Sequence, residues 1–324
     1  MLTTRARASR FRRPTTPTRG LALTERDRAL LEVVHRHRVV RAEHVQALLF
    51  SGRSRRACQY RLRSLWEHRY LDRVYLPVVL RDDVVPARAT QPAYVLGWRG
   101  YDLLTSDRRR DDAELGRPKP LSHRTLEHHL VVTDWIVSIL ATPPPDGFHI
   151  VATEHDHRLA RRAHAARREL ARGRGALVPD GAVTWIAPDD RRLTVYVEVV
   201  RAQVRGGNRR LVDKLGRIAD ANNTGLFRRL YGHESVRAVL IAPPTERRAE
   251  TLRALAERLP HARSLFWFAP YETSTGAPFA TRFQPGSVLD FEWRDASGDH
   301  RTLRSLLTPG SNARVRSEPA RPGG

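Results

Sequence analysis

The chain has 324 residues, long enough for two domains, and its 40% hydrophobic and 28% charged residues are typical of a soluble globular protein. No run of about 18 apolar residues occurs and the N-terminus lacks a signal-peptide pattern, so we expect a cytoplasmic protein without a membrane span. The single cysteine, Cys58, excludes an internal disulfide and a cysteine-based zinc site.

A net charge of +22 is the strongest global signal, and it predicts attraction to polyanions. Nucleic acid is the expected partner, because neutralised phosphates release their counterions. Part of the charge can instead reflect a general abundance of arginine. Of the 57 basic residues only Lys119 and Lys214 are lysines, so a lysine at either place is unusual for this chain.

The two ends of the chain and one internal segment lack the pattern of a packed element. The N-terminal end carries six arginines and no acid, which predicts a disordered basic arm. A polar, proline-broken stretch around Lys119 predicts a linker. The expected parts are an arm (1–20), a DNA-binding domain (21–105), a linker (106–121), a second domain (122–308) and a disordered tail (309–324).

Three helices are expected at the start of the first domain. Thr24, with Asp27 three residues later, forms a capping-box pattern ahead of the first helix. Ser54 caps the third helix over 55–71, whose apolar residues recur at helical spacing. The opposite face of that helix and the preceding turn are polar, and their candidate DNA contacts are Arg53, Arg55, Arg56, Gln59 and Arg63.

Two β-like runs, 71–83 and 91–97, follow the third helix. Three helices and a hairpin are the order of a winged helix-turn-helix, in which the third helix enters the major groove of duplex DNA. The alternative is a three-helix bundle whose arginines only face solvent. The glycine-containing turn ahead of the basic helix favours DNA binding.

The second domain starts with a helix over 122–142, capped by Ser122. Strands are then expected over 148–156, 176–186 and 192–200, and a long helix over 208–232. A strand (235–244), a helix (245–259) and two further strands (263–270 and 287–295) complete the domain. Alternating helices and strands that are apolar on both faces predict an α/β domain with a mixed sheet, in a chain that is α+β overall.

Three carboxylates lie in or beside the first three of these strands, at Glu154, Asp180 and Glu198. Neighbouring strands are about 4.8 Å apart, so the side chains can converge on one hard cation such as Mg²⁺. A cation held there would polarise a phosphate and acidify a bound water. Two alternatives stay open: Asp180 can organise a turn, and Glu198 can pair with an arginine.

The run Val178-Pro179-Asp180-Gly181, with Glu198 at the end of the next apolar strand, resembles the PD-(D/E)xK restriction-endonuclease-like fold. Over residues 22–270 the chain more specifically resembles the replication-relaxation family, whose members are associated with plasmids and other mobile elements. The resemblance implies a winged helix followed by a nuclease-like domain.

The resemblance also implies roles for individual residues. Asp180 matches the Asp of the PD motif, Glu198 the acid of the (D/E)xK motif, and Glu154 an earlier acid found in many such nucleases. Asp180 and Glu198 would hold Mg²⁺, and Glu154 would assist. Val200 stands where the motif has its lysine, which orients the attacking water and stabilises negative charge. Lys214 on the following helix, or Arg201, can supply the missing cation.

Other motifs are weaker evidence of function than these three acids. His155, His157 and His164 have no second ligand cluster with zinc spacing. The basic run over 158–174 either follows a phosphate backbone or is a solvated insertion. No phosphate-binding loop of the GxxxxGK[ST] type occurs, so ATP hydrolysis is not expected.

Two functions of different classes therefore arise. The first is a DNA-binding protein of a plasmid or other mobile element, acting in replication, relaxation or transfer, with or without Mg²⁺-dependent cleavage. The second is a non-catalytic transcriptional regulator or accessory factor on a degenerate nuclease-like scaffold. Double-stranded DNA is the expected partner in both, with replication or conjugation proteins as further partners.

Overall fold

The computed structural model describes residues 13–14, 20–75, 92–106, 122–169, 177–200, 207–234, 236–270 and 288–308. The predicted tail, nearly all of the predicted linker with Lys119, and most of the predicted arm lie outside these ranges. The chain divides into two compact units, Met1–Thr133 and Asp134–Gly324. The division falls inside helix α5 (His123–Leu140) rather than at the start of that helix.

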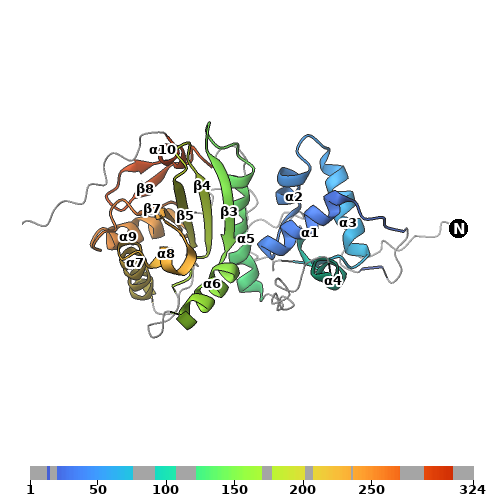
Figure 1. Cartoon of the computed structure of the whole chain (residues 1–324), viewed down its shortest axis with the longest axis horizontal. Helices are drawn as coiled ribbons and strands as arrows, with labels where there is room; N and C mark the ends of the chain where they lie inside the picture. The colour runs from blue at the N-terminus through green and yellow to red at the C-terminus, as the bar shows by residue number, and fades with distance from the viewer. Residues whose placement is uncertain are drawn as a thin grey trace, which may run out of the picture. The chain divides into compact units, whose positions relative to one another are not determined.

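The first unit has three helices followed by an antiparallel strand pair (Figure 1). Val40 adds an isolated bridge to Tyr94 of the second strand. This is the order of elements expected from the sequence, with the segment between the strands, 76–91, outside the described ranges. The elements are α1 (Glu25–His37), α2 (Ala42–Leu49), α3 (Arg55–Glu67), β1 (Leu71–Val74), β2 (Ala93–Leu96) and α4 (Trp98–Ser106).

Caps predicted from the sequence begin two helices of this unit, α1 and α3. The Thr24 side chain accepts a hydrogen bond from the Asp27 backbone N–H, and the Asp27 carboxylate accepts one from the Thr24 backbone, so the capping box is complete. Ser54 accepts a hydrogen bond from the Ala57 N–H at 3.3 Å. Fixing the helix starts in this way directs the apolar stripes into one core around Leu30 and Leu62.

The second unit is built on a seven-stranded mixed sheet with the order β3-β4-β5-β6-β7-β8-β9. β5, β6 and β7 are parallel, whereas the other neighbours are antiparallel. The predicted α/β class is confirmed. The elements are β3 (His149–His155), α6 (Asp156–Glu169), β4 (Gly181–Ile186), β5 (Arg192–Val199), α7 (Gly207–Asn223), α8 (Leu226–Tyr231), β6 (Val236–Ala242), α9 (Glu246–Ala256), β7 (Phe266–Phe268), β8 (Trp293–Asp295), β9 (His300–Arg301) and α10 (Leu303–Leu306).

Helices α6 to α9 pack against one face of this sheet (Figure 1). Their apolar residues, such as Leu215 of α7, form one core with Tyr196 of β5 and Ile241 of β6. Side chains alternate between the two faces of a strand, so Glu198 lies on the same face as Tyr196, toward these helices. On α5, the Trp135 ring packs 4.9 Å from the ring of Trp293 in β8.

Two predictions about this unit are wrong in detail. The helix expected over 208–232 is divided into α7 and α8, because Gly225 adopts a left-handed conformation (φ 67°) that a continuous helix does not contain. The strand expected over 287–295 begins only at Trp293, after a turn at 288–290. None of the helices among the described residues is long and apolar enough for a membrane span.

Candidate active site and nucleic-acid interface

Asp180 and Glu198 lie where β4 begins and β5 ends, at one end of these two neighbouring strands of the second unit. β4 pairs with β5 so that Gly181 faces Val197, which places Asp180 beside the C-terminal end of β5. There the Asp180 Oδ2 accepts a hydrogen bond from the Val199 backbone N–H at 2.8 Å. The three strands that carry Glu154, Asp180 and Glu198 are neighbours in the order expected from the sequence.

Lys214 extends from α7 to the buried Glu198 carboxylate. Its Nζ donates a hydrogen bond to Glu198 Oε1, so the only described lysine forms an ion pair with this carboxylate. Glu198 is 4% exposed, whereas the Lys214 side chain is 31% exposed. The Lys214 side chain is thus partly exposed, although its ammonium group contacts a buried carboxylate sixteen residues away along the chain. Arg201, the other predicted cation, lies outside the described residues.

The ion pair sets the protonation state of Lys214. Burial by itself lowers the pKa of the ammonium group, but the negative charges of Glu198 and Asp180 outweigh burial and raise the pKa above its ordinary value of 10.5. Arg217 is close enough to oppose this rise. Lys214 thus stays protonated at neutral pH, which suits a hydrogen-bond donor or a charge stabiliser and excludes a general base.

Glu154 belongs to a neighbouring network of buried polar groups. Its carboxylate accepts a hydrogen bond from Arg162 at 2.7 Å and contacts His233 Nε2 at 3.0 Å. His233 Nδ1 lies 2.8 Å from the hydroxyl of Tyr196. Burial alone would raise the pKa of Glu154, but hydrogen bonds from His233 and Arg162 outweigh it and lower the pKa below 4.5.

The same network holds the segment that precedes Asp180. Arg162 also donates to the Tyr231 carbonyl, and the Tyr231 hydroxyl donates to the Leu177 carbonyl at 2.6 Å. The Asp156 N–H donates to the Asp180 carbonyl at 2.9 Å, which joins the start of α6 to the residue that precedes β4. Arg162 and Tyr231 thus link Glu154 to the segment that precedes Asp180, and sequence patterns singled out neither Tyr231 nor His233.

The donor set decides which metal could fit. Asp180 and Glu198 offer hard carboxylate oxygens, which Mg²⁺ prefers, and Mg²⁺ in enzymes commonly takes one or two carboxylates with water and substrate phosphate. Among the described residues no group of three or more His, Cys, Asp or Glu side chains is arranged to hold a metal. Two carboxylates are too few to complete the ligands of a Mg²⁺, so an ion held by Asp180 and Glu198 would take its remaining ligands from substrate and water.

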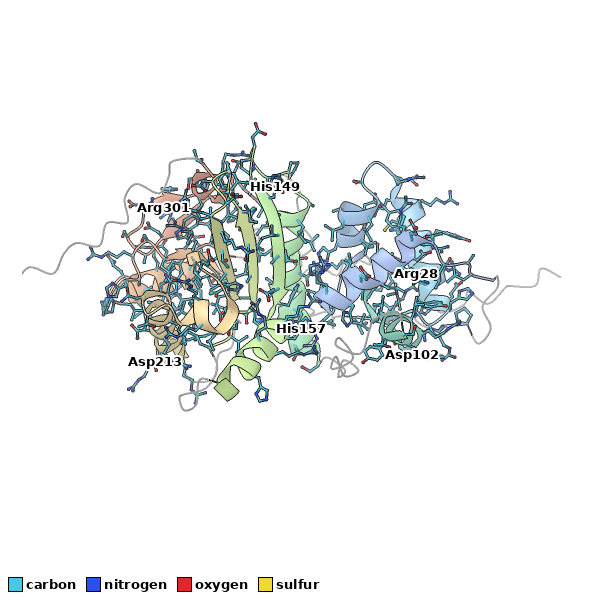
Figure 2. The ribbon with its side chains drawn as sticks, in the orientation of Figure 1. Arg28, Asp102, His149, His157, Asp213 and Arg301 are labelled. Atoms are coloured by element: carbon cyan, nitrogen blue, oxygen red, sulfur yellow. The ribbon has the colours of Figure 1, made fainter. Side chains whose placement is uncertain are left out.

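The site lies at the end of the sheet where β3 and β5 finish. Figure 2 shows His149 and His157 near opposite ends of β3, with Asp213, the residue before Lys214, at the end where His157 lies. The basic run over 158–174 is described only in part. Arg162 pairs with Glu154, while Arg172 and Arg174 lie outside the described residues.

In the first unit, α3 presents a basic face to solvent. Arg55 is held by Glu43 at 2.7 Å and Arg63 by Glu67 at 2.8 Å, so these guanidinium groups are oriented without being buried. Tyr60, which sequence reasoning missed, is 57% exposed and lies one turn from Arg56 and Arg63. All five predicted contact residues are exposed: Arg53, Arg55, Arg56, Gln59 and Arg63.

Two side chains on the inner side of α3, Cys58 and Arg61, do not belong to the exposed face. Cys58 is fully buried, and burial raises the pKa of its thiol to about 12, so it is not an available nucleophile. Arg61, on the inner side of α3, pairs with the buried Asp27 carboxylate and is not part of the exposed face. Arg61 thus serves the fold, whereas Arg55, Arg56 and Arg63 of the same helix are exposed.

Comparison with known proteins identified a family. The family model described as "Replication-relaxation" matches residues 31–236, which covers most of the first unit, Asp180, Glu198 and Lys214. Searches of curated proteins and of solved structures each gave no match.

Proposed function

Because the chain belongs to the replication-relaxation family, with a role in plasmid replication or relaxation, we propose that it binds duplex DNA through α3 and cleaves DNA at the Asp180–Glu198 site. The observation that supports cleavage is the contact between Lys214 and Glu198. It supplies, from α7, the cation that the strand lacks at Val200. The exposed basic face of α3, on a chain of net charge +22, supports DNA binding.

Each side chain would have a separate role in phosphodiester hydrolysis. Asp180 and Glu198 would hold Mg²⁺, which when bound supplies Lewis-acid polarisation of the phosphate and a more acidic water. Lys214, which stays protonated, would donate a hydrogen bond to the attacking water or to a phosphate oxygen and stabilise the developing negative charge. The Glu154 network would position the loop that carries Asp180. Hydrolysis joins the water oxygen to phosphorus and breaks one P–O ester bond; the attacking water loses a proton to solvent, and the departing alkoxide takes up a proton from solvent to become a free hydroxyl.

A nicking assay on supercoiled plasmid tests the cleavage. Wild-type protein with Mg²⁺ should convert supercoiled to relaxed circles, and chelation with EDTA should prevent this. Glu198→Gln and Lys214→Ala should each lower the rate by about 100-fold or more, since each removes a group that acts on the transition state. Arg191→Ala/Arg192→Ala, which removes two exposed arginines at the opposite end of β4 and β5, should leave the rate unchanged.

A second candidate function is a non-catalytic DNA-binding accessory factor. It is favoured by the small donor set, two carboxylates of which one is already neutralised by Lys214. Here the Lys214–Glu198 pair would be a structural ion pair. Duplex binding with no Mg²⁺-dependent nicking under any tested condition would support this candidate and count against the nuclease.

DNA binding by α3 has its own test. Arg56→Ala/Arg63→Ala should weaken duplex binding and lower the steepness of its salt dependence by about 0.9 per lost phosphate contact. The Arg191→Ala/Arg192→Ala pair removes the same charge elsewhere and should have a much smaller effect. Equal effects of the two pairs would argue against α3 as the duplex-binding surface.

A further inference from the structure

We infer that α3 recognises A·T base pairs in the major groove of duplex DNA through two uncharged side chains, Gln59 and Tyr60. This inference rests on the proposed binding of duplex DNA through α3, and it does not require cleavage. It adds sequence preference to charge attraction, because contacts to phosphates carry no sequence information whereas contacts to base edges do. The two residues are neighbours in the second turn of the helix, and both are exposed.

The start of α3 and the turn before it are open to solvent. Every residue over 51–57 is exposed, whereas Trp66 and Glu67 at the other end of the helix are buried. A helix with its side chains is about 10–12 Å wide and the major groove of B-DNA is about 12 Å wide, so this end of α3 can enter the groove. Helices that bind DNA in this way contact base edges mainly through their N-terminal residues.

Tyr60 points away from the core of its unit. It stands two residues after Cys58 and two residues before Leu62, both of which are fully buried. Two residues of α-helix correspond to a rotation of about 200°, so the Tyr60 side chain lies nearly opposite these buried neighbours. Its ring is 57% exposed and offers an apolar surface where α3 is farthest from the core.

Gln59 and Tyr60 lie on either side of the line that joins Arg56 and Arg63. At about 100° per residue each of them is about 50° from that line, so the four side chains share one face of the helix. Arg63 already donates to Glu67 at 2.8 Å. Among the described residues, neither Gln59 nor Tyr60 uses its side chain in a hydrogen bond or an ion pair. The uncharged pair is therefore available for contacts with bases.

The chemistry of the two side chains matches an A·T base pair. The amide of Gln59 has a donor side and an acceptor side, which together match the N7 acceptor and the N6 donor of adenine. The ring of Tyr60 can pack on the C5 methyl group that thymine presents in the major groove. A G·C pair fits less well, because guanine presents two acceptors there and cytosine has no methyl group.

The test begins by selecting short duplexes with a randomised centre on the full chain, which should enrich a consensus that contains A·T base pairs. Replacing thymine by deoxyuridine in the selected duplex removes only the methyl group and should lower wild-type affinity about 4-fold. Replacing adenine by 7-deazaadenine removes the N7 acceptor and should lower it about 5-fold. Tyr60→Ala should abolish the first loss and Gln59→Ala the second. Neither variant should change the salt dependence of binding, because neither changes the charge.

Two control variants separate base recognition from other effects of these substitutions. Tyr60→Phe keeps the ring and should behave like wild type; if it behaves like Tyr60→Ala, the hydroxyl group is the contact and the inference fails. Trp98→Ala removes an aromatic side chain that is 47% exposed at the start of α4. It should leave the consensus and both base-analogue effects unchanged.

Each remaining outcome decides a different claim. A consensus of G·C pairs, or no consensus, overturns the inference while duplex binding through α3 stands. The same holds if both base-analogue effects persist in the alanine variants. If Tyr60→Ala weakens binding to single-stranded DNA more than binding to duplex, the ring stacks on unpaired bases and the inference is overturned. If wild-type protein shows no salt-dependent affinity for duplex, the proposed DNA-binding function itself fails, and the inference fails with it.

Discussion

Lys214 and Glu198 show how one side chain determines the properties of a buried acid. A carboxylate that is 4% exposed is costly to keep charged unless an opposite charge is beside it. Lys214 provides that charge from a side chain that is 31% exposed. The same contact serves two functions that mutagenesis can separate: it stabilises the charged acid, and it holds a protonated donor at the edge of the sheet.

Replacing Lys214 by Met should destabilise the fold, because it leaves the Glu198 carboxylate without its ion-pair partner. We expect a loss of about 1–3 kcal/mol of unfolding free energy, less than for a fully buried pair because the lysine is partly exposed. Urea unfolding measures this loss. The double variant Glu198→Gln/Lys214→Met should recover part of it, and equal instability of the single and double variants would contradict the argument.

The lowered pKa of Glu154 predicts that the stability of the fold decreases at acidic pH. Its folded pKa is lowered below the ordinary 4.5, so the stabilisation it contributes is present above that value and is lost as the pH falls through the folded pKa. Wild-type stability should therefore fall more steeply below about pH 4.5 than that of Glu154→Gln. Unfolding curves between pH 3 and 7 give the two slopes; identical slopes would mean that Glu154 is not held as a charged group.

The raised pKa of Lys214 predicts that the stability of the fold decreases at alkaline pH. Its folded pKa is raised above 10.5, so its contribution is full below that pH and is lost as the pH rises through the folded value. Wild-type protein should lose stability relative to Lys214→Met when the pH exceeds about 10.5. Thermal melting between pH 8 and 11.5 compares the two, and a constant difference over that range would contradict the pairing.

At the scale of elements, the first turn of α1 is tied to the exposed helix of the first unit. Asp27 completes the capping box of α1 and also accepts hydrogen bonds from Arg61 of α3. Burial alone would raise the pKa of Asp27, but the bonds from Arg61 and Thr24 lower it, so the carboxylate stays charged. One acid thus fixes both the start of α1 and the orientation of α3, the helix that carries the predicted DNA contacts.

Replacing Asp27 by Ala should remove the cap and leave Arg61 without this carboxylate. We expect a loss of about 2–4 kcal/mol of unfolding free energy, combining a lost cap with a broken, mostly buried ion pair. Glu25→Ala removes an exposed acid from the same helical turn and should cost less than about 1 kcal/mol. Circular dichroism during denaturation measures both, and similar losses would show that the Arg61 contact adds nothing.

At the scale of the whole molecule, two compact units combine different uses of arginine. In the first unit exposed arginines gather on α3, and in the second exposed arginines include Arg191 and Arg192 at the start of β5 and Arg209 on α7. Other arginines form ion pairs within the fold, as Arg61 does with Asp27 and Arg162 does with Glu154. The net charge of +22 therefore overstates the number of cations that can contact a phosphate. Variants of individual arginines show which residues contact DNA, and the net charge does not.

The sequence by itself determined much of the local structure of this protein. Thr24, Asp27 and Ser54 predicted helix starts correctly, because a cap satisfies backbone N–H groups within a few residues of the chain. Apolar periodicity likewise predicted the strands β3, β4 and β5 and hence the adjacency of the acid-bearing segments. The break at Gly225 was missed, since a glycine inside a helical pattern does not reveal its φ angle.

Only the tertiary structure decided which charged groups meet. The sequence named Lys214 and Arg201 as alternatives, and the packing of α7 on the sheet brought Lys214 to Glu198. It also engaged Glu154 with His233, which is 79 residues away along the chain, a contact that no local spacing encodes. The physical reason is range: caps and periodicity act within a turn or a strand, whereas ion pairs between elements depend on how the whole sheet and its helices pack.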